Sequence, residues 1–337
     1  MSGRIFLRYS AAYFFFAFGD KSMGRKNLVT QIILVLVIVG LYVLSGFLCS
    51  DSTEPDKTIG ERPVQQSTEK NIPSAQPSAG AAKEEPLEYV FSRLDAQIVD
   101  PDRTCPRDRY SLPRPNVGRS DEFSELVAPV TQKQEWKDFD DAVFVGDSVT
   151  LGLQKYVSQK RQTEPDYLGK ARFISVGSYG AATAVAPAGE NCIHRYFNGA
   201  RTQPQEICAA YGAKTVYICL GLNDVGQFSA DEYIANYKTL VENFRREIPD
   251  LKIAIQSVTP ITLYGEKQVL YNAKIDEYNE RLAKFAKEEN CVFLDIADVL
   301  KDEAGYLAES LSSDDYCHLT TEAYERWIDY LLYHGVN

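Results

Sequence analysis

The sequence predicts an α/β fold in which a parallel sheet is covered by helices on both faces. From residue 141 onward, short apolar runs alternate with helix-like segments, and no internal repeat interrupts the alternation. The runs are apolar throughout rather than alternately apolar and polar, as expected for strands buried on both faces of a parallel sheet.

Five apolar runs are predicted to be the strands of this sheet. They are short, contain many β-branched or aromatic residues, and end near Gly, Pro, Asp or Asn. In chain order they are residues 142–146, 171–177, 214–221, 251–260 and 291–298.

Five further segments are predicted to be helices. Pro204 suits a first helical position, and Ser229 with Glu232 forms a capping box. Ile275, Tyr278 and Leu282 recur at the three-to-four spacing of a helix face. The predicted helices are residues 149–160, 204–212, 229–247, 268–289 and 321–333.

Residues 28–48 form a nearly uncharged run of about twenty residues, enough to cross the ~30 Å hydrocarbon core of a membrane. Basic residues precede the run and acidic residues follow it, which predicts a cytoplasmic segment 1–27 and an extracellular remainder. We therefore expect a single-pass signal anchor in the cell membrane. A cleaved signal peptide is the alternative, and Met23 is an alternative start.

The rest of the N-terminal region divides by composition. Residues 49–86 are rich in Ser, Thr, Pro, Gln and Glu, which predicts a disordered linker. Residues 87–140 are mixed in character and are expected to form an arm that packs on the main domain or leads into it. The main domain is predicted to span residues 141–337. A net charge of −11 and a pI near 5.0 argue against a nucleic-acid partner.

The residues that follow the predicted strands are the candidates for a site, because active groups of such sheets lie at the carboxyl ends of the strands. Asp147-Ser148 follows the first strand and opens a helix. Ser148 is either part of a helix cap or a nucleophile that needs a base. Of the three histidines, His318 is the best candidate base, because Asp315 precedes it by three residues and can orient the imidazole.

Donors for a developing oxyanion are found after two other strands. Gly177 offers an unobstructed N–H, and Asn223 offers a neutral side-chain amide. Simple turns are the alternative interpretation of both. The sequence has no HExxH or CxxC spacing, so no metal or other cofactor is predicted.

Together these residues resemble the four motif blocks of the SGNH (GDSL-type) hydrolase family. The blocks are Gly146-Asp147-Ser148, Gly177, Gly221-x-Asn223-Asp224 and Asp315-x-x-His318, in the family order. The resemblance implies a flavodoxin-like three-layer α/β/α sandwich with a central five-stranded parallel sheet. It also implies Ser148 as nucleophile, His318 as general base and acid, Asp315 as its orienting group, and an oxyanion hole from Ser148, Gly177 and Asn223. Ser175 stands where the family has Asn, which leaves Gly180 as an alternative to Gly177.

The resemblance implies a serine esterase that removes short acyl groups, with acetyl expected, from cell-envelope or extracellular polysaccharide or from small esters. The chain is similar to membrane-anchored, cell-surface members of the family. An O-acetyltransferase with the same triad and a non-catalytic glycan-binding module are the alternatives. Four loop aromatics either line a sugar-stacking groove or pack on the domain: Tyr179, Phe228, Tyr264 and Tyr316.

Six of the seven cysteines would lie outside the cell, where disulfides are permitted. Cys219 and Cys291 fall in predicted strands and are expected to be buried thiols. A bridge between Cys192 and Cys317 would fix the loop that carries His318.

Overall fold

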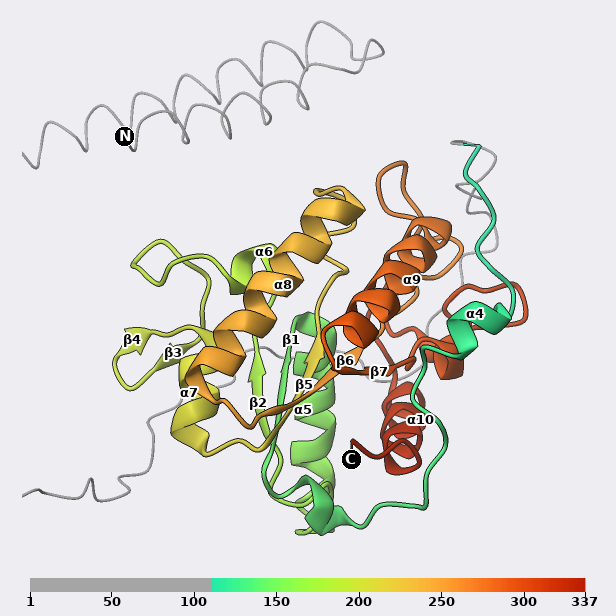
Figure 1. The fold of residues 1–337 in the computed structure, drawn as a ribbon. Coiled ribbons are helices and arrows are strands. Elements are labelled where there is room, and N and C mark those ends of the chain that lie inside the picture. The colour runs from blue at the N-terminus through green and yellow to red at the C-terminus, as the bar shows by residue number, and fades with distance from the viewer. Residues whose placement is uncertain (1–110, 337) are drawn as a thin grey trace, which may run out of the picture. The chain divides into compact units, whose positions relative to one another are not determined.

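The computed structural model describes residues 111–336. In this part of the chain, five parallel strands form one sheet in the order β2-β1-β5-β6-β7 (Figure 1). The strands are β1 (Ala142–Gly146), β2 (Arg172–Ser175), β5 (Thr215–Cys219), β6 (Lys252–Gln256) and β7 (Val292–Leu294). The predicted five-stranded parallel sheet is therefore confirmed.

Helices cover both faces of the sheet. One face packs against α5 (Ser148–Lys160) and α10 (Thr321–Leu332). The other packs against α7 (Pro204–Tyr211), α8 (Ala230–Glu247) and α9 (Asn272–Glu288), of which α8 and α9 lie together in Figure 1. The result is the predicted three-layer α/β/α sandwich.

The strands are apolar throughout because each contributes side chains to two hydrophobic cores, one on each face of the sheet. On β1, Val143 and Val145 belong to the core under α8 and α9, whereas Ala142 and Phe144 belong to the core under α5 and α10. Side chains of a strand alternate between faces, so both sets must be apolar when both faces are covered.

The strand order places a switch point beside β1. The chain passes from β1 to β2 on one side and then crosses to β5 on the other side of β1. In open parallel sheets, ligands bind outside the carboxyl ends of the strands at such a point. Ser148 follows β1 and Asn223 follows β5, so both lie where the topology predicts a site.

Four strands end earlier than their apolar runs predict. The run 251–260 predicts a longer strand than β6, which ends at Gln256. Beyond that point the side chain of Asn279 binds both backbone groups of Val258, at 2.7 Å and 3.0 Å, in place of a neighbouring strand. The apolar run therefore continues past the strand into buried loop.

Several short elements were not predicted from the sequence. They are α4 (Asp121–Ser124), α6 (Ala181–Ala184), the hairpin strands β3 (Tyr196–Phe197) and β4 (Ala200–Arg201), and three 3₁₀ turns at Trp136–Phe139, Asp298–Leu300 and Glu309–Leu311. Each has too few residues to show a periodic pattern.

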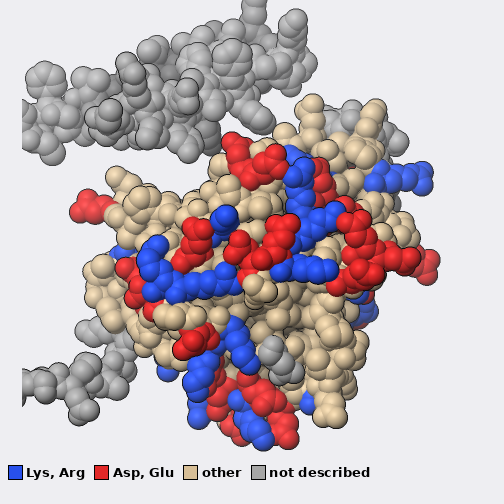
Figure 2. All heavy atoms as spheres, in the orientation of Figure 1, with Lys and Arg blue, Asp and Glu red and all other residues tan. Residues whose placement is uncertain are grey.

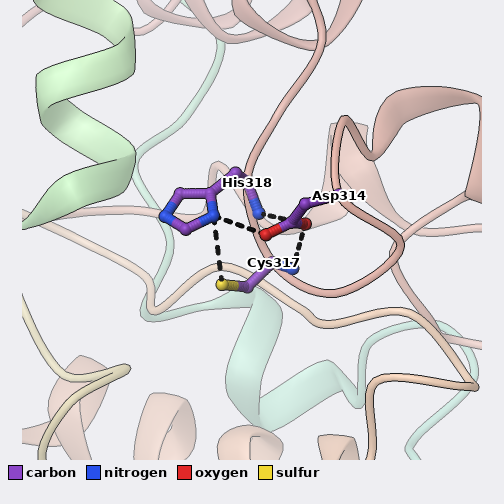
Figure 3. A group of neighbouring side chains, drawn as sticks. All are labelled: Asp314, Cys317 and His318. Carbon is purple, nitrogen blue, oxygen red and sulfur yellow. Dashed lines mark hydrogen bonds and ion pairs between the residues drawn. The ribbon is translucent and has the colours of Figure 1, made fainter. Parts of the chain in front are cut away.

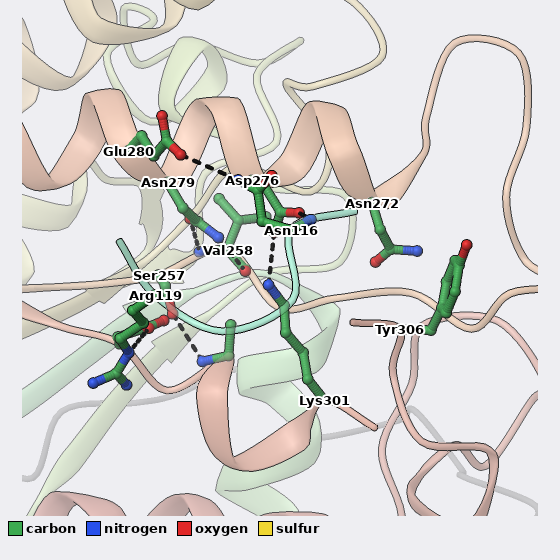
Figure 4. Close-up of polar contacts among 12 residues, drawn as sticks. Asn116, Arg119, Ser257, Val258, Asn272, Asp276, Asn279, Glu280, Lys301 and Tyr306 are labelled. Carbon is green, nitrogen blue, oxygen red and sulfur yellow. Dashed lines mark hydrogen bonds and ion pairs between the residues drawn. The ribbon is translucent and has the colours of Figure 1, made fainter. Parts of the chain in front are cut away.

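The described part of the arm is fixed to the domain by polar contacts (Figure 4). The N–H of Asn116 donates to Oδ2 of Asp276 at 2.7 Å, and Nε of Arg119 lies 2.9 Å from Oδ2 of Asp295. Further along, the N–H of Ala128 donates to the carbonyl of Phe293 on the edge strand β7 at 2.9 Å. The arm thus runs beside an edge that would otherwise present unpaired backbone groups.

Acidic and basic side chains are interspersed on the face of the molecule seen in Figure 2. The expected cytoplasmic segment 1–27, anchor 28–48, linker 49–86 and first part of the arm lie outside the described residues. Among residues 111–336, no helix has both the length and the apolar character that a membrane span requires.

Candidate active site

Ser148 is the first residue of α5, directly beyond the end of β1. Asp147 is the N-cap, and its Oδ1 accepts the N–H of Val149 at 2.8 Å. The sharp strand-to-helix transition requires Gly146, since a Cβ there would lie 1.9 Å from Oγ1 of Thr150. Asp147 is therefore the residue whose side chain caps the helix, and Ser148, the candidate nucleophile, is its neighbour.

His318 connects the serine to a carboxylate. Its Nε2 lies 3.0 Å from Oγ of Ser148. On the other side of the ring, Nδ1 lies 2.5 Å from Oδ2 of Asp314, as Figure 3 shows. Ser148 and His318 are 170 positions apart in the chain. This is the nucleophile–base–carboxylate geometry of an acyl-transfer site.

The expectation that Asp315 orients His318 is corrected to Asp314. The second oxygen of Asp314, Oδ1, accepts the backbone N–H groups of Tyr316, Cys317 and His318 at 3.0–3.1 Å. Folding the loop around one carboxylate leaves Oδ2 directed at the imidazole. Asp315 instead adopts a left-handed φ of 62°, and its carbonyl accepts Oγ1 of Thr262 at 2.7 Å.

The pair shifts the pKa values of both partners. The hydrogen bond from Asp314 raises the pKa of His318 above its ordinary value, although burial acts in the opposite direction. Burial acts to raise the pKa of Asp314, but its hydrogen bond to His318, the imidazolium charge and the backbone N–H groups outweigh it and lower this pKa. The carboxylate is thus ionised when the imidazole takes up a proton.

Asp147 is a second carboxylate near the imidazole, and the sequence analysis placed it in the motif block before Ser148 without giving its carboxylate a role beside His318. It is 3% exposed, and burial raises its pKa to about 6, against the N–H bonds of Val149 and Thr150 and the charge of His318. Its Oδ2 lies 3.3 Å from Nδ2 of Asn223, so it connects the transition from β1 to α5 with the loop after β5.

Asn223 and Gly177 both lie at the carboxyl edge of the sheet, after the two strands, β5 and β2, that flank the strand leading to Ser148. Nδ2 of Asn223 also donates to the carbonyl of Tyr179 at 3.0 Å, in the loop that follows β2. Gly177 is exposed, and a Cβ built on it would meet no atom within 4 Å. The N–H of Gly180, the alternative glycine, donates to Oγ1 of Thr183 at 2.8 Å.

The aromatic residues expected at the rim differ in their exposure. Tyr179 is 1% exposed and its hydroxyl lies 2.7 Å from Nδ1 of His194, so it belongs to the core and not to a groove. Phe228, Tyr264 and Tyr316 are half-buried. The ammonium of Lys267 lies 4.2 Å from the centroid of the Tyr316 ring.

The bridge between Cys192 and Cys317 that the sequence left open is absent, because both are free thiols. Cys317 is buried, and its Sγ lies 3.9 Å from Nδ1 of His318. Cys219 is buried as predicted, whereas Cys291 is only partly buried.

Asp314, Cys317 and His318 also present three ligand atoms within 4.8 Å of one another, the one such group found among the described residues. Two ligands at about 2 Å from a tetrahedral zinc ion stand roughly 3.3 Å apart. The 2.5 Å separation of Oδ2 and Nδ1 is shorter than that, and it fits a hydrogen bond.

The model of the GDSL-like Lipase/Acylhydrolase family matches residues 144–326, more than half of the chain. The chain belongs to this family. The matched range contains Ser148, Asn223, Asp314 and His318, so the GDSL family assignment covers every group of the site. The chain is therefore a serine hydrolase acting on ester bonds.

Solved structures with a similar fold include several hydrolases. A GDSL-like lipase from Bacteroides thetaiotaomicron is 18% identical, with 65% of this chain and 91% of that chain covered and a TM-score of 0.42. An acetyl xylan esterase is 15% identical, with coverages of 56% and 95% and a TM-score of 0.42. A carbohydrate esterase family 3 protein from Talaromyces cellulolyticus is 14% identical, with coverages of 56% and 92% and a TM-score of 0.39. Among curated proteins, no match was found.

Proposed function

We propose that this GDSL hydrolase cleaves short acyl esters, acetyl above all, through a triad of Ser148, His318 and Asp314. The observation that carries the proposal is the continuous hydrogen-bonded line from Oγ of Ser148 through both ring nitrogens of His318 to Oδ2 of Asp314. Since one ring nitrogen faces the hydroxyl and the other faces a carboxylate, the imidazole is set to take the serine proton.

The chemistry has two halves. Neutral His318 takes the proton of Ser148 as Oγ attacks the ester carbonyl, and the resulting imidazolium then gives the proton to the leaving alcohol. A water molecule next attacks the acyl-serine with His318 again as base. The acid is released, and Ser148 recovers its proton. Asp314 stays ionised and stabilises the imidazolium in both halves.

Three donors are proposed for the tetrahedral oxyanion. The N–H of Ser148 lies at the positive end of α5, which is capped by Asp147. The Asn223 amide is held beside the turn by Asp147 and Tyr179. Gly177 is the proposed backbone donor after β2, because it is exposed and unobstructed, whereas the N–H of Gly180 is bonded to Thr183.

The proposed substrate is acylated polysaccharide of the cell envelope. A membrane-anchored enzyme on the predicted linker 49–86 would be held close to this polymer. Phe228, Tyr264 and Tyr316 have partly accessible rings in loops of the domain, and such rings can stack on sugars. We propose single-pass anchoring through residues 28–48 with the hydrolase domain outside the cell.

The test uses the full-length chain and its Ser148→Ala variant. The wild type should release acetate from acetylated envelope glycan and from a short aryl ester, and a serine-directed fluorophosphonate should label it. Ser148→Ala should lose labelling and orders of magnitude in turnover while its melting temperature stays unchanged. Labelling or turnover that survives in the variant would contradict the proposal. Long-chain esters turned over faster than acetyl esters would contradict the substrate class.

A further inference from the structure

The loop between β2 and α6 is held in an unfavourable conformation. Ser178 has a φ of 58°, in the left-handed region that residues with a side chain seldom adopt. The residue lies between Gly177 and Gly180, the two candidate backbone donors. Strain of this kind persists only where the surroundings over-determine the backbone, and it occurs often at functional sites.

Two adjacent residues of the loop after β5 hold this segment. Asn223 binds the carbonyl of Tyr179, as described above. Asp224 accepts the N–H of Ala181 on Oδ2 at 2.9 Å and the N–H of Ala182 on Oδ1 at 3.1 Å. Both carboxylate oxygens are thus used on consecutive backbone donors at the start of α6.

The contact is close as well as polar. A Cβ at Gly180 would lie 2.5 Å from Oδ2 of Asp224, so the absence of a side chain lets the backbone approach the carboxylate. Asp224 is 1% exposed, and its own N–H is fixed by the carbonyl of Gly221 at 2.8 Å. Burying a carboxylate is costly unless it is fully hydrogen-bonded, which makes this arrangement sensitive to the loss of one bond.

We propose that Asp224 is a positioning residue of the oxyanion hole, holding the Gly177–Gly180 segment in register with Asn223 and Ser148. The inference rests on the proposed function, and Asp224 itself is assigned no contact with substrate. Its two oxygens set the start of α6, and through it the strained turn at Ser178 and the orientation of the glycine N–H.

The test is Asp224→Asn, which keeps the size of the side chain but turns one acceptor into a donor facing an N–H. We expect kcat to fall about 10- to 100-fold with KM changed less than about threefold, because an oxyanion hole acts on the transition state. The inhibition constant of a boronic acid that forms a tetrahedral serine adduct should rise by a similar factor. The pKa of His318, followed by NMR of its ring signals, should not move, since the His318–Asp314 contact is untouched.

Asp276→Asn is the matched control, because Asp276 is also buried and accepts a backbone N–H but binds the arm. It should lower the melting temperature without changing kcat per folded molecule. Ala181→Pro is the second variant, because it removes the N–H that donates to Oδ2 at a first helical position where Pro is tolerated. It should reproduce the fall in kcat in part.

Wild-type kcat in Asp224→Asn, or in Ala181→Pro where the former does not fold, would overturn the inference. A parallel loss of kcat and folded fraction that matches Asp276→Asn would overturn it too. Ser148→Ala is assayed alongside, because full activity in that variant would refute the proposed function itself, whichever result Asp224→Asn gives.

Discussion

Asp314 and His318 are joined by a 2.5 Å hydrogen bond from Nδ1 to Oδ2, although Asp315 stands at the spacing expected for the orienting residue. The other oxygen of Asp314 accepts three consecutive backbone N–H groups. One carboxylate therefore shapes the loop and orients the imidazole at once. Because only Asp314 has both roles, substitutions of Asp314 and of its neighbour Asp315 should have different effects on turnover.

Asp314→Asn should lower kcat by about 10²- to 10⁴-fold, because an amide fails to stabilise the imidazolium and can favour the wrong tautomer. Asp315→Asn should keep kcat within about threefold of the wild type. The measurement is steady-state turnover of a short acyl ester, with melting temperatures to confirm that both variants fold. A large loss in Asp315→Asn with none in Asp314→Asn would return the role to the residue at the three-residue spacing.

The pH dependence of turnover should follow His318. The base must be neutral, so activity should fall as pH drops through the pKa of this residue. Since the hydrogen bond from Asp314 raises that pKa, half-maximal activity should lie above pH ~6.5. Asp314→Asn removes the largest cause of the shift and should move the acid limb to lower pH. A rate that stays flat from pH 4 to 8 would argue against His318 as the base.

Asp147 titrates in the same range, because burial raises its pKa to about 6. The two titrations can be distinguished by following the His318 ring signals by NMR while the rate is measured. Agreement between the NMR midpoint and the kinetic midpoint would assign the limb to His318, and a kinetic midpoint nearer 6 would assign it to Asp147.

The glycine donor of the oxyanion hole can be tested with one position and two substitutions. Gly177→Ala keeps the N–H and adds a Cβ that meets no atom within 4 Å, so kcat should stay near wild type. Gly177→Pro removes the N–H and should lower kcat by about 10²- to 10³-fold if this donor binds the oxyanion. Undiminished turnover in a folded Gly177→Pro variant would point to Gly180 instead.

The sequence allowed the sheet to be predicted well because burial on both faces leaves an unambiguous pattern. The strand at 142–146 has the same bounds in the structure, and the helix predicted at 321–333 ends one residue earlier. Elements such as α6 are too short for periodicity to show. The predicted strands are too long where apolar loop residues follow them. The backbone of Val258, for example, is hydrogen-bonded to a side chain and not to a neighbouring strand.

The sequence predicts which loops form the site, but it does not predict every side chain that contributes to it. Because β1 and β5 are adjacent parallel strands, Ser148 and Asn223 lie at the same carboxyl edge of the sheet, independently of the loop conformations. The Asp314-Asp315 doublet offers two carboxylates within one turn of His318, and only the loop conformation decides between them. Asp224 was visible beside Asn223, but its bonds to Ala181 and Ala182 join loops 42 and 43 positions apart, which no local pattern shows.

Arg119 provides a test of the arm that is independent of the chemistry. Its guanidinium bridges Asp295 at 2.9 Å and the exposed Asp298 at 3.0 Å, beside a polar cavity of about 530 Å³ between the arm, α9 and the segment after β7. Burial raises the pKa of Asp295, and the charge of Arg119 opposes that rise. Arg119→Met therefore leaves a carboxylate, 5% exposed, without its nearest cation.

We expect Arg119→Met to lower the free energy of unfolding by about 2 kcal/mol at pH 8 and to leave kcat unchanged. Without the cation, the folded-state pKa of Asp295 should rise further above its unfolded value. The penalty should then be present in full above the folded-state pKa of the variant and fade as pH falls toward the folded-state pKa of the wild type, because below it Asp295 is protonated in both proteins. Urea unfolding at pH 5 and pH 8 measures this difference. Adding Asp295→Asn to the Arg119→Met variant should recover part of the lost stability at pH 8. If the loss of stability depends neither on pH nor on this second substitution, the arm is held by packing and not by the ion pair.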